Sequence, residues 1–264
     1  MKNRSLVITR VTFFCLLNAV VLAAVSGVTK GVSFAWKQQV ILCVTISITF
    51  LLIMGFTKWE QLTLHEVGIV PHKSTVKKVG IGFGIGLLMA LLQPVFIVLL
   101  GHYTIAISPS ISFYTIVFYL TLYILAAIRE ELSFRSYPLF SLNYSIGLWP
   151  SQLIIMILFS LEHVAGGMTW IQAFLGAGTG ALLFGFAALK TKGIALPAGL
   201  HAAWNFGQWS MGFKKETGLA NGIVETGFEA QVDRNAWISY LVIMAIGIVA
   251  FYSYRPKKTR VIST

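Results

Sequence analysis

The chain has 264 residues, of which 56% are hydrophobic and only 11% are charged. Soluble domains carry about a quarter of charged residues, so this composition cannot cover the surface of a soluble globule of this length. Intrinsic disorder is also excluded, because disordered segments combine low hydrophobicity with high charge. The composition therefore predicts an integral membrane protein.

Eight apolar segments are candidates for helices that cross a bilayer, which takes about 20 residues each. They are about 11–28, 39–56, 79–100, 113–135, 148–165, 171–189, 193–211 and 236–254. These segments use most of the chain, so no separate soluble domain is expected. The sequence predicts an all-α, polytopic membrane protein with a single integral membrane domain, 1–264, and a motif-bearing core at about 113–211.

The net charge of +11 bears on the orientation of these helices. With a cytoplasmic N-terminus, 15 of the 20 Lys and Arg residues fall in cytoplasmic segments. This bias follows the positive-inside rule, predicts that both termini are cytoplasmic, and removes the main support for nucleic-acid binding. The first helix could instead be a cleaved signal peptide, because Ala23 and Ala24 resemble a cleavage site. No role is predicted for the 212–235 loop, which is expected on the outer side.

Two glycine runs lie inside the predicted helices. They are Gly80, Gly82, Gly84 and Gly86, and Gly176, Gly178 and Gly180. A nucleotide-binding loop would need a preceding strand and a turn, which these apolar segments lack. The i, i+4 pairs Gly80/Gly84 and Gly176/Gly180 instead predict close helix packing.

Three of the predicted helices carry polar side chains that are costly in a bilayer, at about 2.5–3.5 kcal/mol for each ionisable group. They are Arg129, Glu130, Glu131 and Arg135; Glu162 and His163; and His201 and Asn205. Their presence on three helices favours one shared functional site. The alternative is a solvated Arg-Glu-Glu-Arg cluster at the membrane rim.

The spacing within the first group indicates distinct roles. Glu131 and Arg135 are four residues apart, so they can pair on one helix face. Glu130 is rotated by about 100° from Glu131 and stays free of that pair. A carboxylate held in apolar surroundings suits a general base, and His163 could hold the attacking water with Glu130.

His201 and Asn205 also share a helix face, where they could donate two hydrogen bonds to a developing oxyanion. The predicted depths of Glu130 and His163 in the membrane do not match. In straight, perpendicular helices Glu130 would lie about 8 Å and His163 about 22 Å from the cytoplasmic end. Their meeting requires helix tilt, a displaced helix or a different helix boundary.

At these residues the chain resembles the CAAX protease and bacteriocin-processing (Abi) family, especially its bacterial members. Glu130-Glu131-x-x-x-Arg135, Phe159-x-x-x-His163 and His201-x-x-x-Asn205 match the three family motifs in order, within roughly residues 120–210.

The resemblance implies an all-helical intramembrane endopeptidase with a cavity open to the cytoplasm. It implies that Glu130 and His163 activate water and that His201 and Asn205 bind the oxyanion. Glu131 completes the expected catalytic set, with Arg135, Phe159 and Glu162 as supporting residues. Glu162 departs from the small residue usual in bacterial relatives, and could perturb the protonation of His163 or offer an alternative base.

The resemblance leaves the cofactor open, because both metalloprotease and glutamic-protease mechanisms are attributed to the family. Glu130, His163 and His201 would make a three-ligand zinc site with one open position. Glu131 would then be the base, at the expense of its pairing with Arg135.

The leading hypothesis is hydrolysis of a peptide bond in a membrane-associated peptide or protein, in peptide maturation or bacteriocin self-immunity. The expected location is a bacterial cell membrane, with the site accessible from the cytoplasm. The expected partners are this substrate and the lipid bilayer, without nucleic acid. One alternative is a proton-coupled transporter, because acids and histidines on several helices also form proton relays. Another is a non-catalytic membrane scaffold.

Overall fold

The structure is a computed structural model that describes residues 3–214 and 218–255, and nine α-helices form most of this part of the chain. The helices are α1 (Arg4–Val28), α2 (Lys37–Glu60), α3 (Thr75–Leu99), α4 (Phe113–Glu130), α5 (Tyr137–Ile146), α6 (Leu148–Ala165), α7 (Gly178–Thr191), α8 (Ala195–Ser210) and α9 (Glu229–Ser253). Two π-helical turns, Glu131–Arg135 and Gln172–Ala177, and two short strands, β1 (Tyr103–Ile107) and β2 (Ala220–Val224), complete the regular structure.

The prediction of an all-α, polytopic membrane protein is confirmed. Within the described residues, seven helical segments are long and apolar enough to cross a membrane, and they coincide with seven of the eight predicted spans. The segment predicted at 193–211 is also helical, but α8 has only 16 residues and is mostly buried. Because α3, α4 and α7 all pack against it, α8 has no need to match the thickness of the bilayer.

The helix predicted at 113–135 runs further than its apolar pattern indicates. The π-helical turn Glu131–Arg135 joins α4 to α5, so one apolar helical segment extends from Phe113 to Ile146. The Glu-Glu motif therefore lies in the middle of this segment rather than at its end. The misplaced boundary accounts for part of the depth difference expected between Glu130 and His163.

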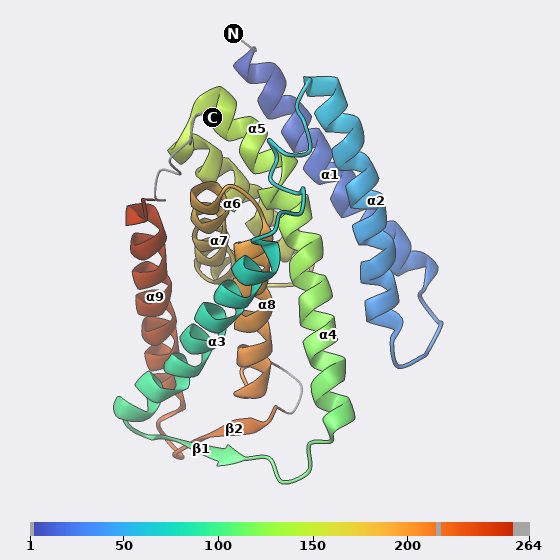
Figure 1. Cartoon of the computed structure of the whole chain (residues 1–264). Helices are drawn as coiled ribbons and strands as arrows, with labels where there is room; N and C mark the ends of the chain where they lie inside the picture. The colour runs from blue at the N-terminus through green and yellow to red at the C-terminus, as the bar shows by residue number, and fades with distance from the viewer. Residues whose placement is uncertain (1–2, 215–217, 256–264) are drawn as a thin grey trace.

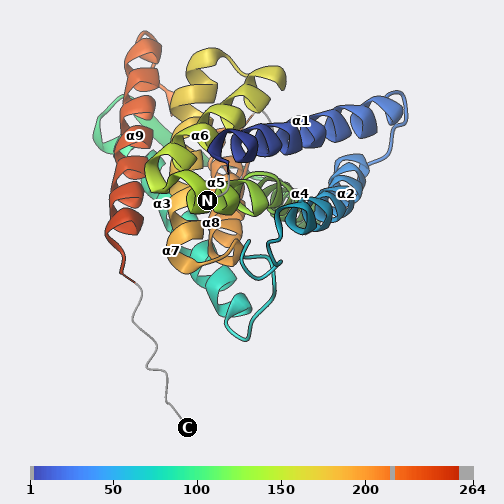
Figure 2. The same cartoon turned by 90° about the horizontal axis from the view of Figure 1, so that it is seen from above.

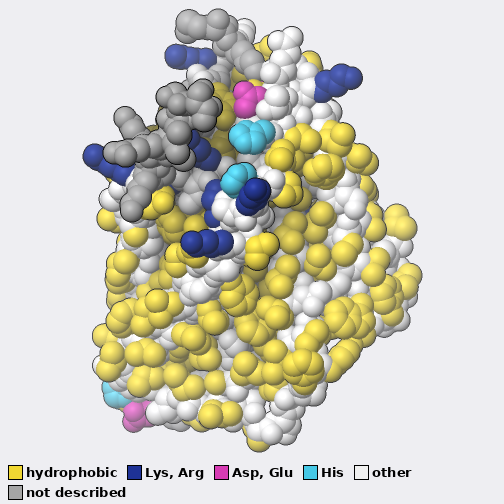
Figure 3. Space-filling model, in the orientation of Figure 1, with side chains coloured by type: hydrophobic (Ala, Val, Ile, Leu, Met, Phe, Trp, Pro, Cys, Tyr) yellow, Lys and Arg dark blue, Asp and Glu magenta, His cyan; other side chains and the backbone are white. Residues whose placement is uncertain are grey.

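The helices form a bundle with α8 inside it. Seen from above, α1 and α2 stand on one side and α9 on the opposite side (Figure 2). The N-terminal end of α1 and the C-terminal end of α9 point toward the same end of the molecule (Figure 1). Lys and Arg side chains gather near this end, while the lower part of the same face is largely hydrophobic (Figure 3). The cytoplasmic orientation of this end stays a prediction. Residues 256–260 of the basic C-terminal segment lie outside the described residues.

A short antiparallel sheet, which the sequence did not predict, lies at the other end of the bundle (Figure 1). Tyr103 of β1 lies opposite Val224 of β2, and Ile107 lies opposite Ala220. The sheet links the connection between α3 and α4 to the segment between α8 and α9. Part of the 212–235 loop thus has a structural role at this end.

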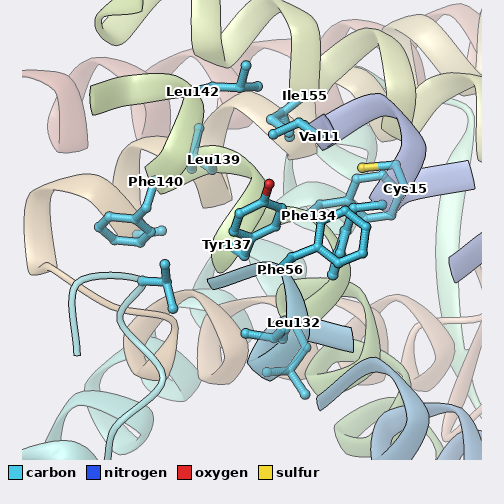
Figure 4. Close-up of a cluster of buried hydrophobic side chains, with 14 of the residues drawn as sticks. Val11, Cys15, Phe56, Leu132, Phe134, Tyr137, Leu139, Phe140, Leu142 and Ile155 are labelled. Atoms are coloured by element: carbon cyan, nitrogen blue, oxygen red, sulfur yellow. The ribbon is translucent and has the colours of Figure 1, made fainter. Parts of the chain in front are cut away.

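Apolar side chains from α1, α2, α5, α6 and the first π-helical turn form the largest buried cluster. Figure 4 shows Tyr137, Phe134, Phe56 and Cys15 within it. The rings of Phe56 and Tyr137 lie 5.5 Å apart. Leu132 and Phe134 of the π-helical turn belong to this cluster, so the cluster supports the turn.

Glycine lets α3 pack closely against α8. A Cβ atom at Gly82 or Gly86 would collide with the backbone carbonyl groups of Leu196 and Leu200 in α8. Gly199 of α8 approaches the backbone of α3 in the same way. This close approach fixes the position of the helix that carries His201.

The predicted glycine pairs are not the ones that make this contact. Added Cβ atoms at Gly80 and Gly84 would have no described atom within 4 Å, and those at Gly176 and Gly180 would meet only side chains. Close packing was thus predicted for the correct run in α3 but on the wrong face. Alternating glycines offer two faces, and their spacing alone does not say which one meets α8.

We expect Gly86→Ala to destabilise the protein by about 1–3 kcal/mol, the usual cost of overpacking. Gly84→Ala is the matched control, because its added methyl group meets open space and alanine favours helix by about 1 kcal/mol over glycine. Thermal unfolding in detergent micelles measures both. Equal stability of the two variants would contradict the importance of the α3–α8 contact.

Candidate active site

The first motif lies where the α-helical geometry is interrupted. α4 ends at Glu130, and the π-helical turn Glu131–Arg135 follows directly, with all five of its residues buried. Such turns are wider than an α-helical turn and are frequent at functional sites. Here the two adjacent glutamates both reach His201 of α8, one at each ring nitrogen.

Glu131 is the fully buried member of the pair. Its Oε1 atom accepts a hydrogen bond of 2.9 Å from Nδ1 of His201. Nη1 of Arg135 lies 3.6 Å from the same oxygen, which confirms the predicted pairing within the helix. Because a carboxylate can only accept this hydrogen bond, Glu131 fixes the His201 tautomer with a proton on Nδ1.

Glu130 is the accessible member of the pair, with 19% of its side chain exposed. Its Oε2 atom lies 3.6 Å from Nε2 of His201. This oxygen is buried and has no hydrogen-bond partner in the described part of the chain. A buried carboxylate oxygen without a partner is costly, so the arrangement leaves an acceptor for a water molecule or a substrate group.

Arg135 is enclosed by aromatic rings. Its guanidinium carbon lies 4.2 Å from the ring centroid of Phe159, 5.6 Å from that of Phe184 and 5.8 Å from that of Phe134. None of its side-chain nitrogens has a hydrogen-bond partner among the described residues. Cation–π attraction and the nearby Glu131 carboxylate therefore stabilise this buried charge. Phe159 of the second motif thus stabilises Arg135 of the first motif.

Phe184 of α7 is a site residue that the sequence did not reveal. Its ring stacks on His201 with a centroid distance of 4.3 Å and an interplanar angle of 16°. It therefore holds the His201 ring from one face while Glu131 holds Nδ1. An aromatic residue in an apolar helix is too common to mark a site, so no sequence signal could have found it.

His163 lies at the edge of the site. Its Nδ1 atom donates a hydrogen bond of 2.9 Å to the carbonyl group of Phe159, because a carbonyl oxygen can only accept. In the neutral ring this leaves a lone pair on Nε2. His163 is close enough to Glu130 to act on it electrostatically, but the described residues show no direct contact between them.

Glu162 has a partner of its own. Its Oε1 atom pairs with Nη1 of Arg129, and both side chains are largely buried. This ion pair ties α6 to α4 next to the Glu-Glu motif. The carboxylate that departs from the bacterial pattern thus neutralises a buried arginine beside the site.

Asn205 lies one helical turn after His201 on α8. Its Oδ1 atom accepts a hydrogen bond of 3.4 Å from Nζ of Lys214. This contact directs the amide nitrogen, which is the donor, away from Lys214. The second predicted oxyanion donor therefore keeps its N–H groups available, and its role stays a prediction.

The three candidate metal ligands do not fit a metal site as they are arranged. In the described residues, no three His, Cys, Asp or Glu side chains form a group that could hold a metal ion. Nδ1 of His201 is bonded to Glu131, and His163 does not contact Glu130 or His201.

The burial of these groups contradicts the alternative of a solvated cluster at the membrane rim. Arg129, Glu131 and Arg135 are 3%, 0% and 0% exposed. The fold and the site together define the class: a polytopic, all-α membrane protein whose interior gathers ionisable side chains from several helices. Residues 112–207, which contain all three motifs, match the family model of type II CAAX prenyl endopeptidases, Rce1-like.

This part of the chain is therefore similar to the Rce1-like CAAX endopeptidases, which are a family of proteases. None of the curated proteins compared with the chain matches it. The family match favours the protease hypothesis over the transporter hypothesis.

We expect Arg135→Met to destabilise the protein by about 3–5 kcal/mol, because it leaves the Glu131 carboxylate buried with one cation fewer. The double variant Glu131→Gln/Arg135→Met removes both charges and should be less destabilised than the single variant. Unfolding in detergent micelles measures this difference. A double variant less stable than Arg135→Met would contradict the coupling of the two charges.

Proposed function

We propose that this protein is an intramembrane endopeptidase that cleaves a peptide bond in a membrane-associated peptide or protein, with Glu130 as the general base. One observation carries this proposal. Oε2 of Glu130 is a buried acceptor without a partner in the described residues, and it lies 3.6 Å from Nε2 of His201. The first and third motifs thus meet at an atom that is free to bind water.

In the proposed mechanism a water molecule donates one hydrogen bond to Oε2 of Glu130. It donates the other to Nε2 of His163, which is left free by the bond between Nδ1 and Phe159. The lone pair of the water oxygen then faces the substrate carbonyl carbon. This geometry suits general-base catalysis, in which the water proton passes to Glu130 during attack.

His201 and Asn205 are the proposed donors to the oxyanion. With Nδ1 bonded to Glu131, His201 faces the substrate with Nε2, which donates to the oxyanion when the ring carries a proton on both nitrogens. The amide nitrogen of Asn205, left free by Lys214, is the second donor. Two such donors aimed at the developing charge contribute a large part of catalysis in acyl-transfer enzymes.

Collapse of the tetrahedral intermediate breaks the bond between carbon and nitrogen. Protonated Glu130 then donates its proton to the leaving amine, which restores the carboxylate. The products are a carboxylic acid and an amine, and the water supplies all the added atoms. Glu131 and Arg135 remain positioning residues in this scheme, because they act through His201.

The proposed substrates are peptide precursors or the tails of membrane proteins, and peptide maturation or bacteriocin self-immunity are the proposed settings. The proposed location is a bacterial cell membrane, with the opening of the site on the cytoplasmic side. The Lys and Arg distribution supports the cytoplasmic placement of both termini. The scaffold hypothesis predicts the same fold without turnover, so only an activity test separates it from this proposal.

We expect Glu130→Gln to lower the rate of cleavage by about 100-fold or more, because it removes the base while keeping the shape of the side chain. Mass spectrometry of membrane peptides cleaved by the wild-type protein in proteoliposomes measures the rate. Glu225→Gln, which alters an exposed carboxylate of a surface ion pair with His102, is the control. If Glu130→Gln cleaves at the wild-type rate, Glu130 is not the general base. If the wild-type protein takes up solute but cleaves no peptide, the transporter hypothesis is favoured.

We expect cleavage to survive treatment with a metal chelator, because the candidate ligands do not converge. The same peptides are used before and after chelation, together with elemental analysis of the purified protein. Activity that is lost on chelation and restored by zinc would contradict the glutamate mechanism.

A further inference from the structure

An apolar groove opens between α3 and α9, and Glu130 and His201 are not among its lining residues. Its volume is about 750 Å³. Apolar side chains line most of it, among them Ile85, Leu88 and Met89 from α3 and Ile243, Ile246 and Phe251 from α9. Leu88 is 59% exposed and Ile246 is 62% exposed, so no described part of the chain covers these walls.

One end of this groove is positively charged. Lys78, Lys190 and Lys192 line it there, and none of the described lining residues is acidic. Nζ of Lys78 donates a hydrogen bond of 2.8 Å to the carbonyl group of Thr191, which holds two of these segments together. Nζ of Lys190 lies 5.5 Å from the ring centroid of Tyr252. Three ammonium groups thus lie at one end of the apolar groove, and no acidic side chain among its described lining residues neutralises them.

The α9 wall of the groove fits within one leaflet of a bilayer. The lining residues of α9 run from Ile243 to Phe251 and rise about 12 Å, at 1.5 Å per residue. Half of the hydrocarbon core of a bilayer is about 15 Å thick. With the lysines at the level of the headgroups, the apolar part of the groove would reach about the middle of the membrane.

We propose that this groove binds a membrane phospholipid with an anionic headgroup. The headgroup phosphate pairs with Lys78, Lys190 and Lys192, and one acyl chain lies along the apolar walls between α3 and α9. Charge complementarity selects this occupant. The phosphate of a zwitterionic lipid comes with an ammonium group of its own, so such a lipid neutralises less of the charge of the three lysines. The hydrocarbon chain of a lipidated peptide fills only the apolar part of the groove.

The test compares phosphatidylglycerol with phosphatidylcholine of the same acyl chains, added to the delipidated full-length protein and counted by native mass spectrometry. A lysine near an anionic headgroup contributes about fivefold in binding, so three contribute on the order of 100-fold. We expect phosphatidylglycerol to bind more tightly than phosphatidylcholine by up to this factor. Lys78→Gln/Lys190→Gln/Lys192→Gln should remove the difference.

The charge-matched control is Lys58→Gln/Lys73→Gln/Lys77→Gln, which removes three exposed lysines that do not line the groove. It should keep the preference for phosphatidylglycerol. Equal loss of binding in the two triple variants would overturn the proposal, because it would show that overall charge attracts the lipid.

A second pair of variants tests the apolar part. Ala250 is an exposed lining residue, so Ala250→Trp should fill the groove and weaken phosphatidylglycerol binding at least tenfold. Val249→Trp, on the neighbouring exposed face of α9, should leave it unchanged. Equal binding of phosphatidylglycerol by these two variants would overturn the proposal. The proposal would also be overturned if a farnesylated peptide bound in the groove and phosphatidylglycerol did not.

Discussion

The buried carboxylate of Glu131 is the group on which the arrangement of the site depends. A charge with no access to water must be paired and hydrogen-bonded, because the cost of removing an ion from water exceeds any single weak contact. Glu131 meets this requirement through Arg135 on its own helix and His201 on α8. The requirement links α4 to α8, sets the tautomer of His201 and directs Nε2 of that ring toward Glu130.

The supporting structure keeps these charges close together. Phe134, Phe159 and Phe184 surround the Arg135 guanidinium, so that this cation stays beside Glu131 although its nitrogens have no hydrogen-bond partners in the described residues. The glycines of α3 and α8 allow two backbones to touch, which places His201 within reach of the π-helical turn. Backbone packing between α3 and α8 thereby contributes to the distances between His201 and the two glutamates. The two adjacent glutamates differ in their surroundings. Glu131 is fully enclosed, whereas the side chain of Glu130 is 19% exposed and its buried Oε2 atom has no hydrogen-bond partner in the described residues.

Several predictions from the sequence depended on features that one helix carries by itself. Apolar segments of about 20 residues predicted the membrane spans, because length and hydropathy are local properties. The pairing of Glu131 with Arg135 followed from a spacing of four residues. The departure at Glu162 was visible in the sequence, whereas its pairing with Arg129 on another helix was not. The role of Asn205 as an oxyanion donor remains untested.

The amino-acid sequence by itself determined an all-α membrane protein, its main spans and the three motifs that carry the polar residues. Only the tertiary structure decided which of these residues meet: His201 with both glutamates, Arg129 with Glu162, and Gly82 and Gly86 with α8. The physical reason is that helical periodicity assigns residues to faces of one helix but does not set the rotation, tilt or depth of its neighbours. The π-helical turn Glu131–Arg135 is a second reason, because its wider geometry changes the direction in which side chains leave the helix at the point where the site is formed.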